Sequence, residues 1–248
     1  KRIILTGGGT AGHVTPNIAL IPELKKRGFE IHYIGSKTGI EKELIGNFDI
    51  PYYGISSGKL RRYFDVKNFT DPFRILKGYS EAKKLIKKIK PDVIFSKGGF
   101  VTVPVVKAAS RQKVPCVLHE SDISPGLANR LCIPSATAIC ANFPETIANL
   151  PEDKAYLTGT PIRSELFSGN RLKGLDFCGF TANKPVILVI GGSLGSVRVN
   201  EAVREILPKL LEKYQVIHLC GKDKVDESLK QTEGYVPVSY THLRAHET

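Results

Sequence analysis

The sequence predicts an α/β protein with two domains, each built around a parallel β-sheet. Short apolar runs alternate with helical patterns along the 248 residues, as expected of a parallel sheet wound with helices. One design also occurs twice, a strand followed by glycines, a small polar residue and a helix, at residues 3–26 and 184–211. Because one such unit opens each half of the chain, we expect two Rossmann-like domains that face one cleft.

The first half of the chain supplies strands and helices in alternating order. The strand Arg2–Thr6 leads to a helix with Thr15 as the expected N-cap and Pro16 as its first residue, and Gly28 ends that helix. Further strands are predicted at Glu30–Gly35, Pro51–Ile55, Asp92–Ser96, Val114–His119, Thr137–Ala141 and Ala155–Thr158. A long helix at 72–90 carries one apolar stripe, formed by Phe73, Leu76, Tyr79, Ala82, Leu85, Ile86 and Ile89.

The composition is that of an ordinary globular protein with an excess of positive charge. Hydrophobic residues make up 42% of the chain, and no apolar run is long enough to span a bilayer. The five cysteines lack zinc-binding spacing, so we expect free thiols. The net charge of +12 is concentrated between Lys59 and Lys90, where eleven Lys or Arg stand against three Asp or Glu. Such a segment favours a polyanion or an anionic surface.

The first glycine loop raises the question of a dinucleotide. Gly7, Gly9 and Gly12 fit the pattern G-x-G-x-x-G, but nicotinamide dinucleotide binding also needs an acidic residue at the end of the second strand. That strand ends in Ser36-Lys37, and Glu30 stands at its start instead. An NAD(P)-dependent oxidoreductase is therefore the weaker alternative. A further alternative is that the loop is a tight strand-to-helix turn that binds no ligand.

His13 stands at the mouth of this loop, beside the start of a helix. The positive end of a helix disfavours an imidazolium ion, so His13 should stay neutral and able to accept a proton. That is the state a general base needs. The alternative is a hydrogen bond that only shapes the loop.

The second glycine loop fits the hydrolase pattern G-x-S-x-G at residues 191–195. A hydrolase also needs a downstream histidine on a loop, whereas His218 lies within a predicted strand. We expect Ser193 and nearby backbone N–H groups to hold phosphate oxygens at a helix N-terminus. Because no D-x-D carboxylate pair is present, we expect no metal, with helix ends, Arg and Ser stabilising a diphosphate.

Five motifs together resemble the MurG family of glycosyltransferases, which transfer N-acetylglucosamine from UDP-GlcNAc to lipid I and so form lipid II of peptidoglycan. They are GGGTAGHVTPN at 7–17, SKGGFVTVPVVKAA at 96–109, LHESDISPGLANR at 118–130, GTPIR at 159–163 and GGSLGS at 191–196. The resemblance runs from residue 1 to about residue 235. It implies a GT-B architecture with an incomplete second domain, and inverting transfer to the acceptor 4-hydroxyl without a cofactor.

The resemblance also implies the site residues. His13 would be the base or an acceptor-orienting group, while Glu120 and Asn129 are lesser candidates in the acceptor loop. The residues expected to contact UDP-GlcNAc are Thr10, Ala11, Gly12, Arg163, Ser193 and Asp122. The family often has asparagine at the position of Asp122, and a carboxylate beside a diphosphate would be repelled unless it binds sugar hydroxyls.

The resemblance gives the basic segment a role in docking to a membrane. Lipid I is an undecaprenyl diphosphate in the inner leaflet, so the enzyme would bind that anionic surface peripherally, from the cytoplasmic side. The docking candidates are Arg61, Arg62, Phe64, Phe73, Arg74 and Lys77. A solvated helix face would show the same charges, and a non-catalytic basic membrane-binding protein is a further alternative. No nucleic-acid-binding module is recognisable.

The expected organisation has three parts. Residues 1–160 form the acceptor and membrane-side domain, 161–236 form part of the UDP-GlcNAc-binding domain, and 237–248 are expected to be non-native sequence. A full second domain usually needs on the order of 150 residues. We therefore expect weak or no transfer by these 248 residues alone, and an exposed apolar edge in the second domain.

Overall fold

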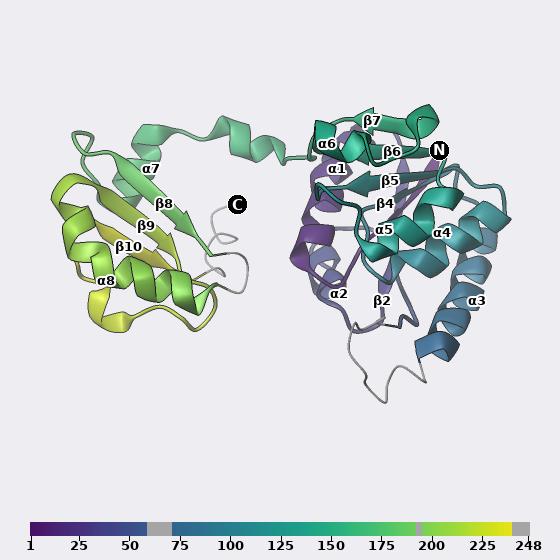
Figure 1. The fold of residues 1–248 in the computed structure, drawn as a ribbon, viewed down its shortest axis with the longest axis horizontal. Helices are drawn as coiled ribbons and strands as arrows, with labels where there is room; N and C mark the ends of the chain where they lie inside the picture. The colour runs from purple at the N-terminus through teal and green to yellow at the C-terminus, as the bar shows by residue number, and fades with distance from the viewer. Residues whose placement is uncertain (59–70, 192–194, 240–248) are drawn as a thin grey trace. The chain divides into compact units, whose positions relative to one another are not determined.

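The computed structural model describes residues 1–58, 71–191 and 195–239. The chain divides into two compact units, residues 1–167 and residues 168–248, each built of strands and helices (Figure 1). The domain limits expected from the sequence, 160 and 236, remain predictions. Among the described residues, no helix is both long enough and apolar enough to cross a bilayer.

The first unit contains a seven-stranded parallel sheet with the order β3-β2-β1-β4-β5-β6-β7. Its strands are β1 (Arg2–Thr6), β2 (Glu30–Ser36), β3 (Tyr52–Ile55), β4 (Val93–Ser96), β5 (Cys116–Glu120), β6 (Ala138–Ala141) and β7 (Ala155–Leu157). The strand order reverses at β1, which pairs with β2 on one side and β4 on the other. In open parallel sheets, ligands bind beyond the carboxyl ends of the strands at such a reversal.

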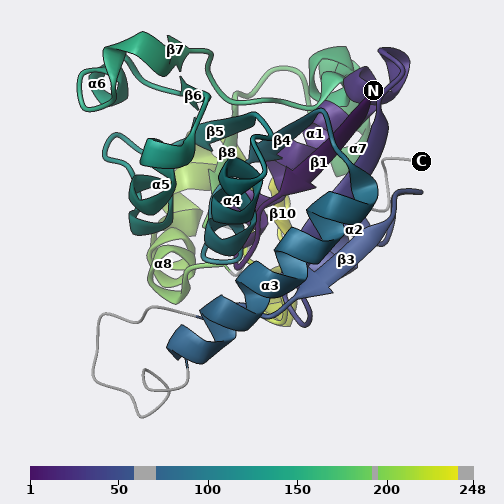
Figure 2. The ribbon, with the colours of Figure 1, turned by 90° about the vertical axis from the view of Figure 1, so that its right-hand side faces the viewer.

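Helices cover both faces of this sheet. They are α1 (Thr15–Lys26), α2 (Ile40–Ile45), α3 (Asp71–Ile89), α4 (Thr102–Arg111), α5 (Leu127–Cys132) and α6 (Pro144–Ile147), with short 3₁₀ turns η1 (Ala11–His13), η3 (Ile133–Ser135) and η4 (Glu152–Lys154). Alternate strand residues face opposite ways, so Ile3 and Leu5 pack with α1 and α2. Ile4 packs with α3 and α4 on the other face, where these two helices lie side by side (Figure 2).

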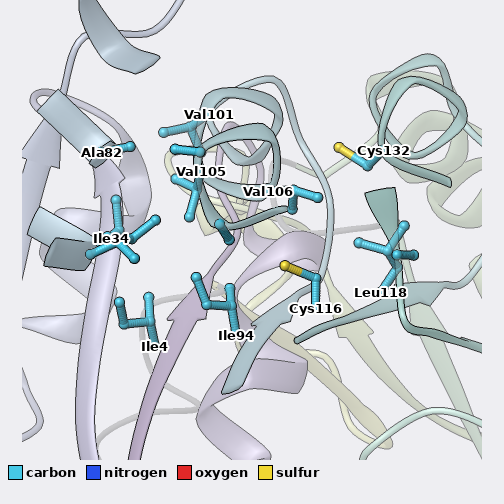
Figure 3. Packing of buried hydrophobic residues seen from close by; sticks show 14 of the residues in the cluster. Ile4, Ile34, Ala82, Ile94, Val101, Val105, Val106, Cys116, Leu118 and Cys132 are labelled. Carbon is cyan, nitrogen blue, oxygen red and sulfur yellow. The ribbon is translucent and has the colours of Figure 1, made fainter. Parts of the chain in front are cut away.

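The first unit has one hydrophobic core on each face of its sheet, and the larger core lies under α4. Figure 3 shows Ile4, Ile34 and Ile94 of three adjacent strands directed toward Val101 and Val105. All five side chains are at most 4% exposed. This dry layer holds the strands rigidly, so the loops at their carboxyl ends start from fixed positions.

Every strand predicted in this unit is present, with ends shifted by at most two residues. The expected N-cap of the first helix was wrong. Thr15 is the first residue of α1 and Val14 is its N-cap; the Thr15 hydroxyl donates instead to the carbonyl oxygen of Ala11 at 3.1 Å. The apolar stripe of α3 is buried only in its second half, because Phe73 and Leu76 are 75% and 65% exposed.

The second unit holds a three-stranded parallel sheet with the order β10-β9-β8. Its elements are η5 (Ser164–Ser168, which crosses the division), α7 (Arg171–Cys178), β8 (Val186–Ile190), α8 (Val197–Lys213), β9 (Gln215–Leu219), η6 (Glu227–Leu229) and β10 (Tyr235–Val238). Leu207 of α8 packs on Val216 and Tyr235 on one face of the sheet. On β8, Leu188 and Ile190 are 56% and 58% exposed.

Candidate functional site

A large cavity lies at the carboxyl edge of the seven-stranded sheet, where the strand order reverses. Its volume is about 1080 Å³, and the residues that line it follow β1, β2, β3, β4 and β5 in the chain. All of the described residues around it belong to the first unit. The fold therefore brings five loops from separate parts of the sequence to one site.

Two glycine loops meet at the centre of the cavity wall. The backbone N–H of Gly8, after β1, donates to the carbonyl oxygen of Gly98, after β4, at 3.3 Å. Gly99 has φ +91°, and a Cβ atom there would overlap the backbone of Gly8. Position 99 therefore requires glycine, both because its φ is positive and because the backbone of Gly8 lies too close for a side chain.

Buried polar side chains hold the first glycine loop from behind. The hydroxyl of Tyr33 donates to the carbonyl oxygen of Gly7 at 2.8 Å, and the amide of Asn17 donates to that of Thr6 at 3.2 Å. Asn17 also donates to the Tyr33 hydroxyl at 3.2 Å. The loop is thus fixed from the sheet side and presents its other side to the cavity.

Glu41 holds the same loop from the side and was missed by the sequence analysis. Its fully buried carboxylate accepts hydrogen bonds from the backbone N–H groups of Ser36, at 2.9 Å, and Gly9, at 3.2 Å. A Cβ atom at Gly8 would overlap this carboxylate. The acidic group that follows the second strand is therefore occupied by hydrogen bonds to backbone N–H groups of the protein. This argues against a role for Glu41 in binding the ribose of a dinucleotide.

The His13 imidazole lines the cavity from η1 with its tautomer fixed by the loop. Its Nδ1 atom lies 3.1 Å from the carbonyl oxygen of Gly8 and 3.2 Å from the hydroxyl oxygen of Thr10. A carbonyl oxygen only accepts, so Nδ1 must carry the proton and donate it. Nε2 is then the ring atom that can accept a proton.

The surroundings of His13 also keep the imidazole neutral. Burial lowers the pKa of His13, and the nearby Lys97 ammonium lowers it further. The Gly8 carbonyl and, more weakly, the carboxylates of Glu120 and Asp122 act in the opposite direction. The net result is a pKa below the ordinary value of 6.5.

Glu120, at the end of β5, shapes the loop that forms the opposite wall. Its carboxylate is 4% exposed and accepts from the backbone N–H groups of Asp122, at 2.9 Å, and Gly126, at 3.0 Å. The amide of Asn129, on α5, donates to it at 2.8 Å. Glu120 therefore acts in the structure as the brace of the β5–α5 loop.

Lys97 follows β4 directly and was also missed by the sequence analysis. Its side chain lines the cavity but is only 1% exposed, and its Nζ donates to the Ser121 hydroxyl at 3.0 Å. Burial lowers the pKa of Lys97, against the opposing effect of the carboxylates of Glu120 and Asp122. A strand end followed by Lys-Gly-Gly is the signal that could have found it.

The structure brings together only part of the predicted site. Thr10, His13, Arg74, Glu120, Asp122 and Asn129 line the cavity. Among the described residues, Ala11 is buried within η1, Gly12 of the same turn is exposed and does not line the cavity, and Arg163 lies on the segment after β7. Phe73 and Lys77 lie near the start of α3. Ser193, Arg61, Arg62 and Phe64 lie outside the described residues.

The chain is similar to known proteins along almost its whole length. The glycosyltransferase family 28 N-terminal domain matches residues 3–141, and the family 28 C-terminal domain matches residues 186–245. A UDP-N-acetylglucosamine–N-acetylmuramyl-(pentapeptide) pyrophosphoryl-undecaprenol N-acetylglucosamine transferase of Lachnoclostridium phytofermentans is 70% identical over 97% of this chain. The same transferase of Lachnospira eligens is 64% identical over 97%. This chain spans 68% of the length of each.

Two solved structures share the fold. The crystal structure of Acinetobacter baumannii MurG superposes with a TM-score of 0.67 at 27% identity, covering 96% of this chain and 65% of that one. UDP-GlcNAc 2-epimerase of Neisseria meningitidis, bound to UDP-GlcNAc, gives a TM-score of 0.66 at 16% identity, covering 96% and 72%. The second likeness concerns the fold alone.

Proposed function

The chain belongs to glycosyltransferase family 28, and we propose that it serves the transfer of N-acetylglucosamine from UDP-GlcNAc to the muramoyl 4-hydroxyl of lipid I, which forms lipid II. The relatives' names describe transfer onto an N-acetylmuramyl-(pentapeptide) pyrophosphoryl-undecaprenol. The observation that carries the proposal for this chain is the neutral His13, held by Gly8 in a cavity large enough for a sugar diphosphate.

In the proposed reaction His13 is the general base. Nε2 takes the proton of the acceptor 4-hydroxyl while that oxygen attacks C1 of N-acetylglucosamine from the face opposite the diphosphate. The bond between C1 and the diphosphate oxygen breaks, and UDP leaves with the bonding electrons. The configuration at C1 is thereby inverted. The Nδ1–H bond to the Gly8 carbonyl strengthens as charge develops on the ring, which stabilises the imidazolium.

The donor side of the proposal rests on fewer described contacts. Thr10 and Asp122 line the cavity, where they can bind hydroxyl groups of the transferred sugar. We propose that Arg163 and Ser193 hold the diphosphate, and that Ala11 and Gly12 shape the loop next to it. For Asp122, a contact with sugar hydroxyls fits better than one with the diphosphate, since two anions repel.

We further propose that the start of α3 docks on the anionic inner leaflet, at the cytoplasmic face of the membrane. Exposed Phe73 and Leu76 can insert shallowly beside the charges of Arg74 and Lys77. Each basic side chain contributes about 1 kcal/mol near such lipids. Arg74 also lines the cavity, so docking would place the cavity close to a lipid-linked acceptor.

Vesicle sedimentation tests this docking. Arg74→Glu with Lys77→Glu should weaken binding to anionic vesicles by at least about tenfold, with little change on zwitterionic vesicles. Lys87→Glu with Lys88→Glu, at the exposed far end of the same helix, is the matched control for charge. Equal weakening by both pairs would show that only net charge matters and would overturn the docking surface.

The transfer itself is tested by UDP release with UDP-GlcNAc and a lipid I analogue. We compare the 248-residue chain with an extended enzyme, in which a family 28 C-terminal segment takes over after β10, from residue 240, and continues to the relatives' full length. We expect turnover by the extended enzyme and weak or no turnover by the chain alone. If neither releases UDP although both are folded, the proposed function fails.

A further inference from the structure

Lys97 is a buried cation that has no carboxylate in direct contact among the residues that the structure describes. Its side chain is 1% exposed and lines the cavity. An ammonium group has three hydrogens to donate, and one goes to the Ser121 hydroxyl at 3.0 Å. Among the residues that the structure describes, no carboxylate forms an ion pair with Lys97. A buried charge is costly unless it is paired, so an anion is expected from the cavity side.

Asn129 presents the complementary group, an acceptor without a donor. Its Nδ2 atom donates to the carbonyl oxygen of His119 at 3.2 Å and to the carboxylate of Glu120 at 2.8 Å. Both partners only accept, so the orientation of the amide is fixed and Oδ1 faces the other way. Oδ1 is buried and has no hydrogen-bond partner among the described residues. The residue is 7% exposed and lines the same cavity.

Both residues border the loop that follows β4 and line the same cavity. Asn129 Oδ1 lies against the Cα of Gly98, where a Cβ atom would be 3.3 Å away, and Gly98 is the neighbour of Lys97 in the chain. Glu120 and Ser121, which are neighbours in the chain, also connect the two residues. The Glu120 carboxylate accepts a hydrogen bond from the Asn129 amide, and the Ser121 hydroxyl accepts one from the Lys97 ammonium. A ligand here must therefore offer an anionic oxygen close to a hydrogen-bond donor.

We propose that Lys97 and Asn129 form a subsite for a 2-acetamido sugar 1-phosphate, with Lys97 on a phosphate oxygen and Asn129 Oδ1 on the amide N–H. In such a sugar the phosphate is on C1 and the amide is on C2, so both groups stand side by side. The subsite rests on the proposed function, because UDP-GlcNAc and the muramoyl diphosphate of lipid I both carry this arrangement. It assigns a role to a lysine and an asparagine that the transfer step itself does not use.

Binding of small sugar phosphates to the whole chain tests the subsite without any turnover. The probes are N-acetylglucosamine 1-phosphate and glucose 1-phosphate, titrated by NMR. Because glucose 1-phosphate lacks the amide N–H, comparing the two sugars tests the contact with Asn129 without any mutation of the protein. The variants are Lys97→Met and the charge-retaining Lys97→Arg. Lys107→Met is the matched control, because Lys107 also donates to a serine hydroxyl, Ser135 at 3.1 Å, but lies outside the cavity lining.

We expect Lys97→Met to weaken binding of N-acetylglucosamine 1-phosphate by about tenfold to a hundredfold, as for loss of a hydrogen bond to a charged group. Lys97→Arg should restore part of it, and Lys107→Met should bind as the native chain does. The native chain should bind glucose 1-phosphate about tenfold more weakly, from the loss of one hydrogen bond. Equal affinity of Lys97→Met and the native chain, equal affinity for the two sugars, or no binding of either would overturn the subsite.

The two natural sources are separated by titrating UDP-GlcNAc and a short-chain lipid I analogue. A loss on Lys97→Met confined to the lipid I analogue assigns the subsite to the acceptor, and a loss confined to UDP-GlcNAc assigns it to the donor. Unchanged affinity for both overturns the proposal. UDP release by the extended enzyme tests the proposed function independently of these binding measurements. A failure of the subsite can therefore be distinguished from a failure of the proposed function.

Discussion

The Nδ1 atom of His13 lies 3.1 Å from the carbonyl oxygen of Gly8, so the loop that forms the cavity also sets the protonation of its histidine. Gly8 is fixed in turn by its N–H bond to Gly98 at 3.3 Å. The loops after β1 and β4 therefore act as one unit in presenting Nε2. In the proposed reaction, glycines far apart in the sequence thus serve a single proton transfer.

The pH dependence of transfer should reflect the lowered pKa of His13. Because burial and Lys97 lower this pKa, the acid limb of kcat/KM for the extended enzyme should lie below pH 6.5. Lys97→Met removes the charge that lowers the pKa, so the acid limb should move to higher pH. The pH profiles of the two enzymes measure both statements. An acid limb that stays in place, or moves to lower pH, contradicts the electrostatic link between the two residues.

Stability should fall on mild acidification because of two further buried histidines. Burial lowers the pKa of His119, which is 1% exposed, and of His218, which is fully buried. The unfolded chain takes up these protons near pH 6.5 and the folded chain only at lower pH, so the unfolded state binds more protons below pH 6.5. The urea midpoint should therefore decrease between pH 7.5 and pH 5.5. A midpoint that increases over this range would show that other groups dominate.

Removing the carboxylate of Glu120 should destabilise the first unit. In Glu120→Ala, the N–H groups of Asp122 and Gly126 and the amide of Asn129 lose their acceptor. Leaving a buried donor unsatisfied costs about 1–3 kcal/mol. The Asn129 amide is buried and the two N–H bonds are only partly buried, so we expect the free energy of unfolding to drop by about 2–4 kcal/mol. Urea denaturation measures this drop. Glu43→Ala, at an exposed position on α2, is the control, and an equal change in both variants would contradict the role of Glu120 as a brace.

Two glycines of similar motifs should respond differently to alanine. Gly99 has φ +91° and contacts the backbone of Gly8, whereas at Gly12 the nearest atom to an added Cβ would be the Thr10 hydroxyl oxygen at 3.8 Å. Gly99→Ala should lower the melting temperature by several degrees, through at least about 1–2 kcal/mol of backbone strain. Gly12→Ala should melt close to the native chain. Equal melting temperatures would mean that the loop after β4 can move away from the loop after β1.

Local sequence patterns were sufficient for the fold because each strand is a short apolar run between turn residues. Arg2–Thr6 was placed to the residue, and the α/β class and the family were confirmed by the structure and the relatives. The stripe of α3 shows what periodicity leaves open. It is apolar throughout, but Phe73 and Leu76 are exposed whereas the residues from Tyr79 onward pack against the core, and periodicity carries no information on where a neighbouring element ends.

The candidate site was predicted only where the reactive side chain and the groups that position it stand in the same sequence motif. His13 stands within the glycine motif, and its tautomer depends on Gly8, five residues before it. Glu41 bonds to Gly9 from 32 positions away, and Lys97 is one of 36 Lys and Arg in the chain. Nothing local distinguishes Glu41 from a solvated charge, and the one local signal for Lys97 is its place between a strand end and two glycines. Their burial is a property of the assembled sheet.

The most direct test of the account is UDP release by the extended enzyme carrying His13→Gln, with UDP-GlcNAc and a lipid I analogue. His32→Gln is the matched control, since His32 lies in the same unit, bonds to Glu30 at 3.0 Å and does not line the cavity. We expect kcat for His13→Gln to fall by about 10²–10⁴, while His32→Gln stays close to the native rate. A native rate in His13→Gln would contradict the role of His13 as general base.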